Sequence, residues 1–181
     1  MDNDQIKLNN LDQAIALLDK AIENDPNNPE LYLNRGDARL EKWEYYAALN
    51  DYTKAIELNP NNAEAYYSRG LAYHVYRRAL GAIEDYTRAL ELEPKHVMAY
   101  VNRGNSYFHL GKDDLALADY NRAIELNPND ADAYVERATL YLRLSEYEKC
   151  MADCETALKL DPDFDDARFY FCRAARLLRE M

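Results

Sequence analysis

The 181-residue sequence has few glycines, few cysteines and no long apolar run. A membrane-spanning helix needs about 20 consecutive apolar residues, and residues 1–10 are polar, unlike a cleavable leader. Basic residues are outnumbered, 22 against 33 acidic ones, which gives a formal net charge of −11 without any basic cluster. This charge argues against binding to nucleic acid or to an anionic membrane. We therefore expect a soluble, cytoplasmic protein.

Motifs for catalysis are also missing. The sequence has no phosphate-binding loop, no HExxH, no nucleophile elbow and no paired catalytic carboxylates. His74, His96 and His109 suggest a shared metal site, but no carboxylate or cysteine is spaced to complete it. Contact of individual histidines with a partner is the favoured alternative. We expect no enzyme activity, no cofactor and no metal.

What the sequence does have is a period of 34 residues. Several residue types recur at this spacing: Pro26, Pro60, Pro94, Pro128 and Pro162; Tyr32, Tyr66, Tyr100 and Tyr134; Ala55, Ala89, Ala123 and Ala157; Gly36, Gly70 and Gly104, followed by Ala138. A fixed period of this length is typical of repeat architectures.

Each period predicts two helices. In residues 97–130, apolar residues recur at helical spacing in both halves, for example Leu117, Tyr120 and Ile124 in the second half. Gly111 supplies the turn between the halves. Pro128 ends the second helix because it has no amide hydrogen and disfavours helical geometry in the residue before it. The unit is therefore a helical hairpin.

The same unit resembles the tetratricopeptide repeat family. The matching residues are Tyr100, Gly104, Tyr107, Ala116, Tyr120, Ala123 and Pro128. The resemblance extends over essentially the whole chain. It implies an all-α fold, a right-handed α-solenoid of helix-turn-helix hairpins with a 34-residue period.

The period predicts six segments. They are an N-terminal half repeat at 1–28, four repeats at 29–62, 63–96, 97–130 and 131–164, and a C-terminal capping helix at 165–181. The repeat at 63–96 has no glycine in its turn, so we expect an irregular turn there. The apolar stripe of residues 11–22 is poorly covered. Either Ile6 and Leu8 fold back over it, or the chain is part of something longer, or this end docks onto another copy.

The three cysteines replace repeating core residues. Cys150 stands where earlier repeats have alanine, Cys154 where they have tyrosine, and Cys172 where they have the packing glycine. Their spacing does not fit a metal site. We expect all three to be buried and reduced, with a thiol switch or a metal site as the alternatives.

Every full repeat has an arginine in its first helix and an aspartate 16 residues later. The pairs are Arg35 with Asp51, Arg69 with Asp85, Arg103 with Asp119 and Arg137 with Asp153. Pairing between neighbouring repeats would leave Arg35 facing Leu17 and Asp153 facing Phe171. We therefore predict four salt bridges within repeats, using the planar fork of arginine. A row of arginines that binds an acidic ligand is the functional alternative.

The resemblance also implies a binding surface. In tetratricopeptide proteins the first helix of each repeat lines a concave groove that binds peptide segments. The expected groove residues are Leu33, Asn34, Tyr67, Leu71, His74, Val75, Met98, Val101, Asn102, Asn105, Phe108, His109 and Arg143. The apolar members in its middle predict an exposed patch of the kind that marks a binding site, with the asparagines holding a peptide backbone. Packing of these residues between repeats is the alternative.

The predicted function is a non-catalytic scaffold that binds a protein or peptide. One subgroup of the family grips carboxylate tails with a cationic clamp, but the matching positions here are not cationic. Glu30, Asp37, Asp132 and Glu136 instead favour a neutral or basic partner. The alternative function is a self-assembling structural module that associates through residues 11–22.

Overall fold

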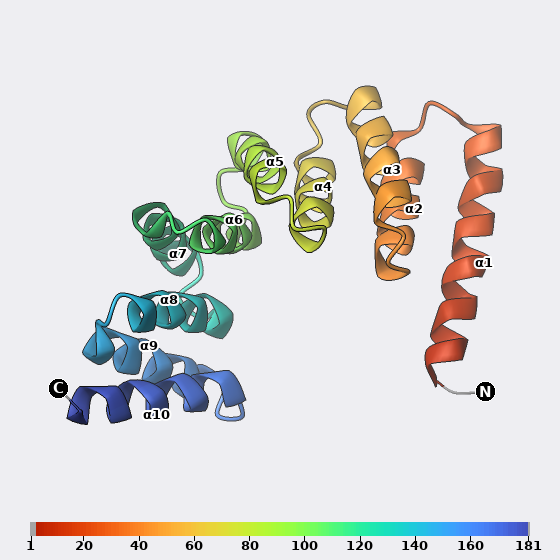
Figure 1. Cartoon of the computed structure of the whole chain (residues 1–181). Helices are drawn as coiled ribbons and strands as arrows, with labels where there is room; N and C mark the ends of the chain where they lie inside the picture. The colour runs from red at the N-terminus through yellow and green to blue at the C-terminus, as the bar shows by residue number, and fades with distance from the viewer. Residues whose placement is uncertain (1–2, 181) are drawn as a thin grey trace. The chain divides into compact units, whose positions relative to one another are not determined.

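The computed structural model describes residues 3–180, and their side chains from residue 7 onwards. Throughout this range the secondary structure is helical, and no strand is present (Figure 1). A boundary between Pro94 and Lys95 divides these residues into two compact units.

Both units consist of antiparallel helical hairpins. The first unit contains α1 (Asn3–Asn24), α2 (Pro29–Glu41), α3 (Tyr45–Leu58), α4 (Ala63–Val75) and α5 (Ala79–Leu92). The second unit contains α6 (Val97–His109), α7 (Asp113–Leu126), α8 (Ala131–Arg143), α9 (Tyr147–Leu160) and α10 (Asp165–Arg179). The hairpins are α2 with α3, α4 with α5, α6 with α7, and α8 with α9. The predicted all-α helical repeat is confirmed.

The first helix of each hairpin begins at a side-chain cap. Asn28 accepts a hydrogen bond from the amide of Glu30 at 3.1 Å, and Pro29 follows at the first helical position, where no amide bond is lost. Asn62 and Asp130 cap α4 and α8 in the same way. His96 takes this role in α6, where its Nδ1 accepts from the amide of Ala99 at 3.3 Å. This histidine is therefore part of a helix start.

The four turns inside the hairpins share one backbone conformation. Gly111 has a φ of 68°, and the residues at the same position in the other repeats are Trp43 at 64°, Arg77 at 59° and Ser145 at 62°. The expected irregular turn in the repeat at 63–96 is therefore wrong. Arg77 adopts the left-handed conformation that glycine adopts more easily, at a cost of about 1–2 kcal/mol, and the turn keeps its form.

Helix α1 is longer than the half repeat suggested. It runs without interruption through Ile6 and Leu8 to Asn24 and packs against α2. A short cap that folds back over the stripe is therefore ruled out. Leu17 on this helix is 67% exposed, so one side of α1 has no cover among the described residues.

A glycine and a tyrosine set the separation of the two helices in three hairpins. A Cβ atom on Gly36, Gly70 or Gly104 would lie only 2.6–2.7 Å from the ring of the facing tyrosine, which is Tyr120 for Gly104. In the fourth hairpin alanine replaces the glycine, and the facing residue is Cys154, which is smaller than tyrosine and is fully buried. The larger alanine is thus matched by the smaller cysteine, because the space between the two helices is fixed.

The expectation that all three cysteines are buried is wrong for one of them. Cys150 and Cys154 are buried, but Cys172 is exposed. Cys172 occupies the glycine position in α10, and among the described residues no second helix follows α10 to supply the facing tyrosine. Cys172 is therefore exposed on the side where an internal hairpin has the tyrosine of its second helix.

We predict that Gly104→Ala lowers the stability of the protein by about 1–3 kcal/mol, the usual cost of overpacking. The cause is contact of the new methyl group with the Tyr120 ring. In a Tyr120→Cys background, which copies the fourth hairpin, the same substitution should cost little or nothing. Urea unfolding of the four proteins in this double-mutant cycle measures the coupling. An equal cost of Gly104→Ala in both backgrounds would refute the packing explanation.

Candidate functional site

The two helices of each hairpin are joined by an arginine and an aspartate. Nε and Nη2 of Arg35 donate to the two carboxylate oxygens of Asp51 at 3.0 and 2.6 Å. In the other three pairs both contacts measure 2.7 or 2.8 Å. The aspartate side chains are only 4–9% exposed. All four predicted pairs form, and each is two-pronged and largely buried.

The same arginines also reach the hairpin before them. Arg35 donates to Asp19 of α1 at 2.7 Å, Arg69 to Thr53 at 3.2 Å and Arg137 to Asn121 at 2.6 Å. These acceptors lie 16 residues before the arginine, at a position that the sequence pattern did not single out. The arginines are thus occupied on two sides, which argues against the alternative that they form a row for an acidic ligand.

The first helices lie against one another within each unit. In the first unit α2 contacts α4, and in the second unit α6 contacts α8, which contacts α10. We call the surface of these helices that faces away from the second helices the first-helix face. Among the predicted groove residues, exposed side chains are Asn34, Val75, Met98, His109 and Arg143, and half-buried ones are Tyr67, Leu71, His74, Asn102, Asn105 and Phe108.

Two predicted groove residues do not belong to an exposed patch. Leu33 is 5% exposed and packs in the core of the first unit with Tyr32 and Tyr52. Val101 is 4% exposed and packs with Ala123 and Ala133. For these two residues the alternative of packing between helices is correct, because the next helix lies against them.

Phe108 and Arg143, which come from α6 and α8, are joined to each other. The guanidinium carbon of Arg143 lies 3.6 Å from the centre of the Phe108 ring, and Nη1 donates to the Phe108 carbonyl at 2.7 Å. Nη2 of Arg143 also pairs with Asp113. The arginine therefore covers the ring as a cation–π partner, and substitution of Phe108 affects folding as well as the surface.

Carboxylates on the first-helix face have raised pKa values. Burial raises the pKa of Asp37, although a hydrogen bond from Tyr52 at 2.8 Å acts in the opposite direction. Burial likewise raises the pKa of Glu136, and its hydrogen bond with Asn105 opposes the shift. In the part of the chain that the structure describes, neither carboxylate has a lysine or arginine partner.

The buried tyrosines connect the core to this face. The hydroxyl of Tyr52 donates to Asp37, and that of Tyr120 donates to Asn105 at 2.6 Å. The matching position for Tyr86 holds Leu71, and the buried Tyr86 hydroxyl has no hydrogen-bond partner. Burial accordingly raises the pKa of Tyr86 far above its usual value. The ring of Tyr67 lies beside it, with the ring centres 5.9 Å apart.

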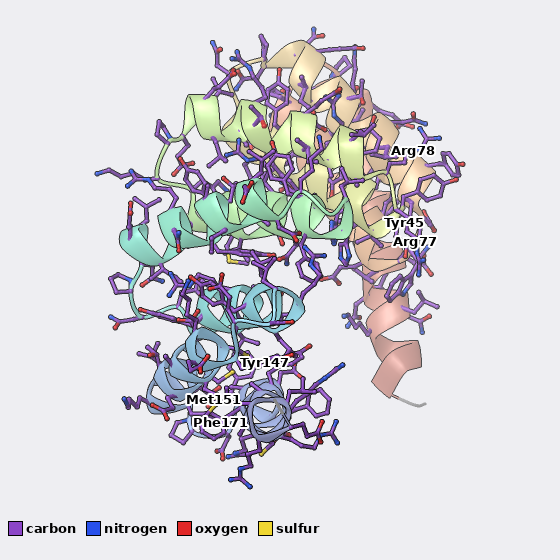
Figure 2. The ribbon with its side chains drawn as sticks, turned by 60° about the vertical axis from the view of Figure 1, so that its left-hand side comes forward. Tyr45, Arg77, Arg78, Tyr147, Met151 and Phe171 are labelled. Atoms are coloured by element: carbon purple, nitrogen blue, oxygen red, sulfur yellow. The ribbon has the colours of Figure 1, made fainter. Side chains whose placement is uncertain are left out.

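The structure also gathers aromatic residues at the turns of the first unit. Tyr76 lies 5.0 Å from Tyr46 and 6.3 Å from Tyr45, measured between ring centres, and Trp43 lies 6.2 Å from Tyr45. Arg78 stands over the Tyr76 ring at 5.3 Å. Figure 2 shows Tyr45, Arg77 and Arg78 at one edge of these helices. The sequence did not predict this cluster. The one indication in the sequence is that Tyr46 and Tyr76 fall outside the tyrosine positions that recur every 34 residues.

Two kinds of feature are absent from the described residues. In residues 3–180 no helix has the length and apolar character that a membrane crossing requires. The side chains described there include no group of three or more histidines, cysteines or carboxylates placed to hold a metal ion.

Comparisons with known proteins agree on one family. Models of the tetratricopeptide repeat match residues 97–130 and 131–164, a second such model matches 63–96, and a model described as TPR repeat matches 3–42 and 36–74. Together these matches cover most of the chain. No curated protein sequence matches it.

Solved structures with the same fold are numerous. MamA is 26% identical, with a TM-score of 0.79 over 90% of this chain and 96% of the MamA chain. YrrB, described as a TPR protein with an unusual peptide-binding site, is 26% identical, with a TM-score of 0.76 over 89% of this chain and 83% of its own. The TPR domain of Arabidopsis OM64 is 31% identical, with a TM-score of 0.62 over 64% and 95%.

We predict that the three buried tyrosines respond differently to loss of the hydroxyl. Tyr52→Phe and Tyr120→Phe should each lower stability by about 1 kcal/mol, because a hydrogen bond is lost. Tyr86→Phe should leave stability unchanged or raise it, because it removes a buried hydroxyl that has no partner. Thermal and urea unfolding compare the three variants. A similar loss in all three would show that Tyr86 has a partner.

Proposed function

We propose a function from one established premise: this chain belongs to the tetratricopeptide repeat family. It acts as a scaffold for protein interaction, without catalytic activity, and binds a peptide or protein segment on the first-helix face. The peptide-binding site of YrrB, a protein of similar fold, supports this choice. The ligand is neutral or basic.

The observation that carries this proposal is the state of Asp37 and Glu136. Both carboxylates have raised pKa values, Glu136 on a half-buried side chain and Asp37 on an exposed one, and no cationic side chain among the described residues compensates them. The half-buried Glu136 gains more from a cation than an exposed carboxylate does, because water screens the attraction less. A lysine, an arginine or an amino terminus of a ligand supplies that cation.

Exposed apolar side chains supply the second component of recognition. Val75 is 44% exposed and Met98 is 45% exposed, each on a first helix. Tyr67 and Leu71 are half buried on α4 and add apolar area to the first unit. A segment with one basic residue and neighbouring apolar residues matches this surface in chemistry. It needs no enclosed pocket, because main-chain groups of an extended ligand can pair with the amide of the exposed Asn34.

A second candidate function is self-association through residues 11–22. The observation that favours it is Leu17, which is 67% exposed on α1. A leucine so exposed on an otherwise packed helix suggests that another surface covers it. This function does not exclude peptide binding, because it uses a different helix.

The proposed binding surface can be tested by truncating an exposed side chain, a change that should not disturb folding. Peptides selected from a displayed random library on the wild type, then measured singly by fluorescence anisotropy, should bind Met98→Ala at least about 10-fold more weakly, roughly 1.4 kcal/mol. The matched control is Leu115→Ala, an exposed leucine on the second helix α7 of the same unit. If the control loses as much affinity as the first variant, the first-helix face is not the binding surface.

The carboxylates predict a pH dependence. For a selected basic peptide, affinity should be full near pH 7 and should fall as the pH drops through the raised pKa of Glu136, above its ordinary 4.5. The sign follows because protonation removes the charge that attracts the cation. Glu136→Gln should bind weakly and flatten this profile, whereas Glu148→Gln on α9 should leave it unchanged. A profile that is flat in the wild type would contradict a role for Glu136.

A further inference from the structure

Each end of the helical array is half of a hairpin. Helix α1 has the repeat position of a second helix, and among the described residues no first helix precedes it. Helix α10 has the position of a first helix, and no second helix follows it within residues 3–180. We propose that α10 of one copy receives α1 of another copy, so that the two helices form a hairpin between molecules.

This proposal rests on the second candidate function and names the surface that α1 meets. Repeat positions define which residues would face each other. Leu17 has the position of Asp51, Asp85, Asp119 and Asp153, and Phe171 has the position of the arginines that pair with them. The buried ion pair of the internal hairpins is thus replaced by an apolar pair, and the replacement occurs on both sides of the same contact.

The close contact between glycine and tyrosine is also replaced on both sides. Leu18 has the position of Tyr52, Tyr86 and Tyr120, and Cys172 has the position of the glycines that face them. Even one methyl group on such a glycine would meet the tyrosine ring at 2.6–2.7 Å. Cys172 therefore excludes a helix that carries tyrosine and accepts one with the smaller leucine. Helix α1 meets this requirement, whereas α3, α5 and α7 do not.

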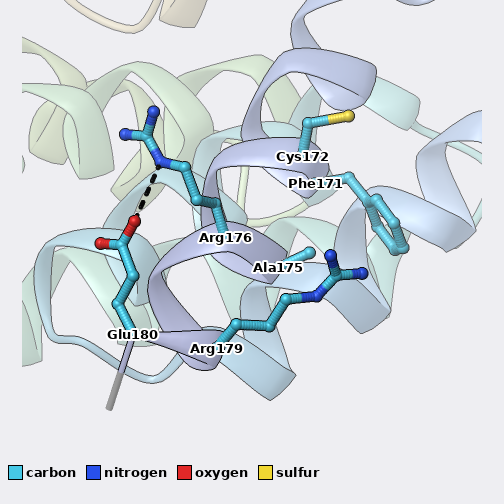
Figure 3. A pocket seen from close by; sticks show the side chains of 6 residues that line it. All are labelled: Phe171, Cys172, Ala175, Arg176, Arg179 and Glu180. Carbon is cyan, nitrogen blue, oxygen red and sulfur yellow. Dashed lines mark ion pairs between the residues drawn. The ribbon is translucent and has the colours of Figure 1, made fainter.

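The surface of α10 that would receive α1 is accessible and contains a pocket. A pocket of about 530 Å³ lies along this helix, and Figure 3 shows its lining: Phe171, Cys172, Ala175, Arg176, Arg179 and Glu180. Ala175 stands where three internal first helices carry tyrosine, which adds to the space. Phe171 packs, together with Tyr147 and Met151, against the buried core of the second unit (Figure 2).

Charge complementarity supports α1 as the occupant. Helix α10 carries four arginines and two aspartates, net +2. Helix α1 carries four acidic residues and two lysines, net −2. In a chain of net charge −11, α10 is thus a locally basic surface, and opposite charges favour the encounter of the two ends. Because the contact joins two different surfaces, it is heterologous and builds head-to-tail chains.

The test exchanges the apolar pair for the internal ion pair. Wild-type protein should gain mass with concentration in analytical ultracentrifugation. Phe171→Arg alone and Leu17→Asp alone should each weaken association at least about 100-fold, because a charge is buried without a partner. An equimolar mixture of the two variants should regain head-to-tail chains in which the variants alternate, because the unchanged Leu17 of one variant meets the unchanged Phe171 of the other, and the two substituted residues form the ion pair of the internal hairpins. Leu80→Asp, at a leucine 65% exposed on α5, is the matched control and should associate like the wild type.

A second readout locates the contact. Of the three cysteines only Cys172 is exposed, so alkylation by iodoacetamide should slow as the wild-type concentration rises, and should stay fast in either single variant. Circular dichroism melting checks that all variants fold. A wild type that stays monomeric overturns both this proposal and self-association. A wild type that associates with Cys172 still reactive, or that tolerates Phe171→Arg, overturns the α1–α10 contact and leaves self-association standing.

Discussion

The buried arginine–aspartate pair is the contact on which this structure depends. Each pair joins the two helices of a hairpin through two hydrogen bonds, and Arg35, Arg69 and Arg137 also bond to the preceding hairpin. Removal of one partner from a buried pair costs about 3–5 kcal/mol, because the other charge is left without compensation. A hairpin that slips along its neighbour would break both kinds of bond. The pair therefore fixes the alignment of helices in an array whose core is otherwise made of alanine and tyrosine.

The tyrosines of that core also influence the surface. Tyr52 and Tyr120 donate their hydroxyl groups to Asp37 and Asn105 on the first-helix face, whereas Leu71 leaves the hydroxyl of Tyr86 without a partner. The residue at this one position of a repeat thus decides whether the hydroxyl of the buried tyrosine has a hydrogen-bond acceptor.

The ends of the array differ from its interior in a coordinated way. Leu17, Leu18, Phe171 and Cys172 each break the repeat pattern, and each belongs to the contact that an internal hairpin makes between its two helices. Terminal repeats of a solenoid normally carry a polar outer surface. Helix α10 has arginines, but it also keeps Cys172 exposed. Substitutions on both sides of one contact are simplest to explain when the two sides meet.

The sequence alone predicted the helices, their period and the four ion pairs, because these depend on residues a fixed distance apart along one chain. The caps Asn28 and Asp130 are local in the same sense, because they act on amides two or three residues away. It did not predict that Leu33 and Val101 are buried, that Arg143 covers Phe108, or that Cys172 is exposed. Nor did it show that Arg77 keeps the glycine conformation of the turn. The burial of Leu33 and Val101 and the contact of Arg143 with Phe108 depend on a helix of a neighbouring repeat. The exposure of Cys172 and the conformation of Arg77 depend on how the helices on either side pack, and only the tertiary structure decides that.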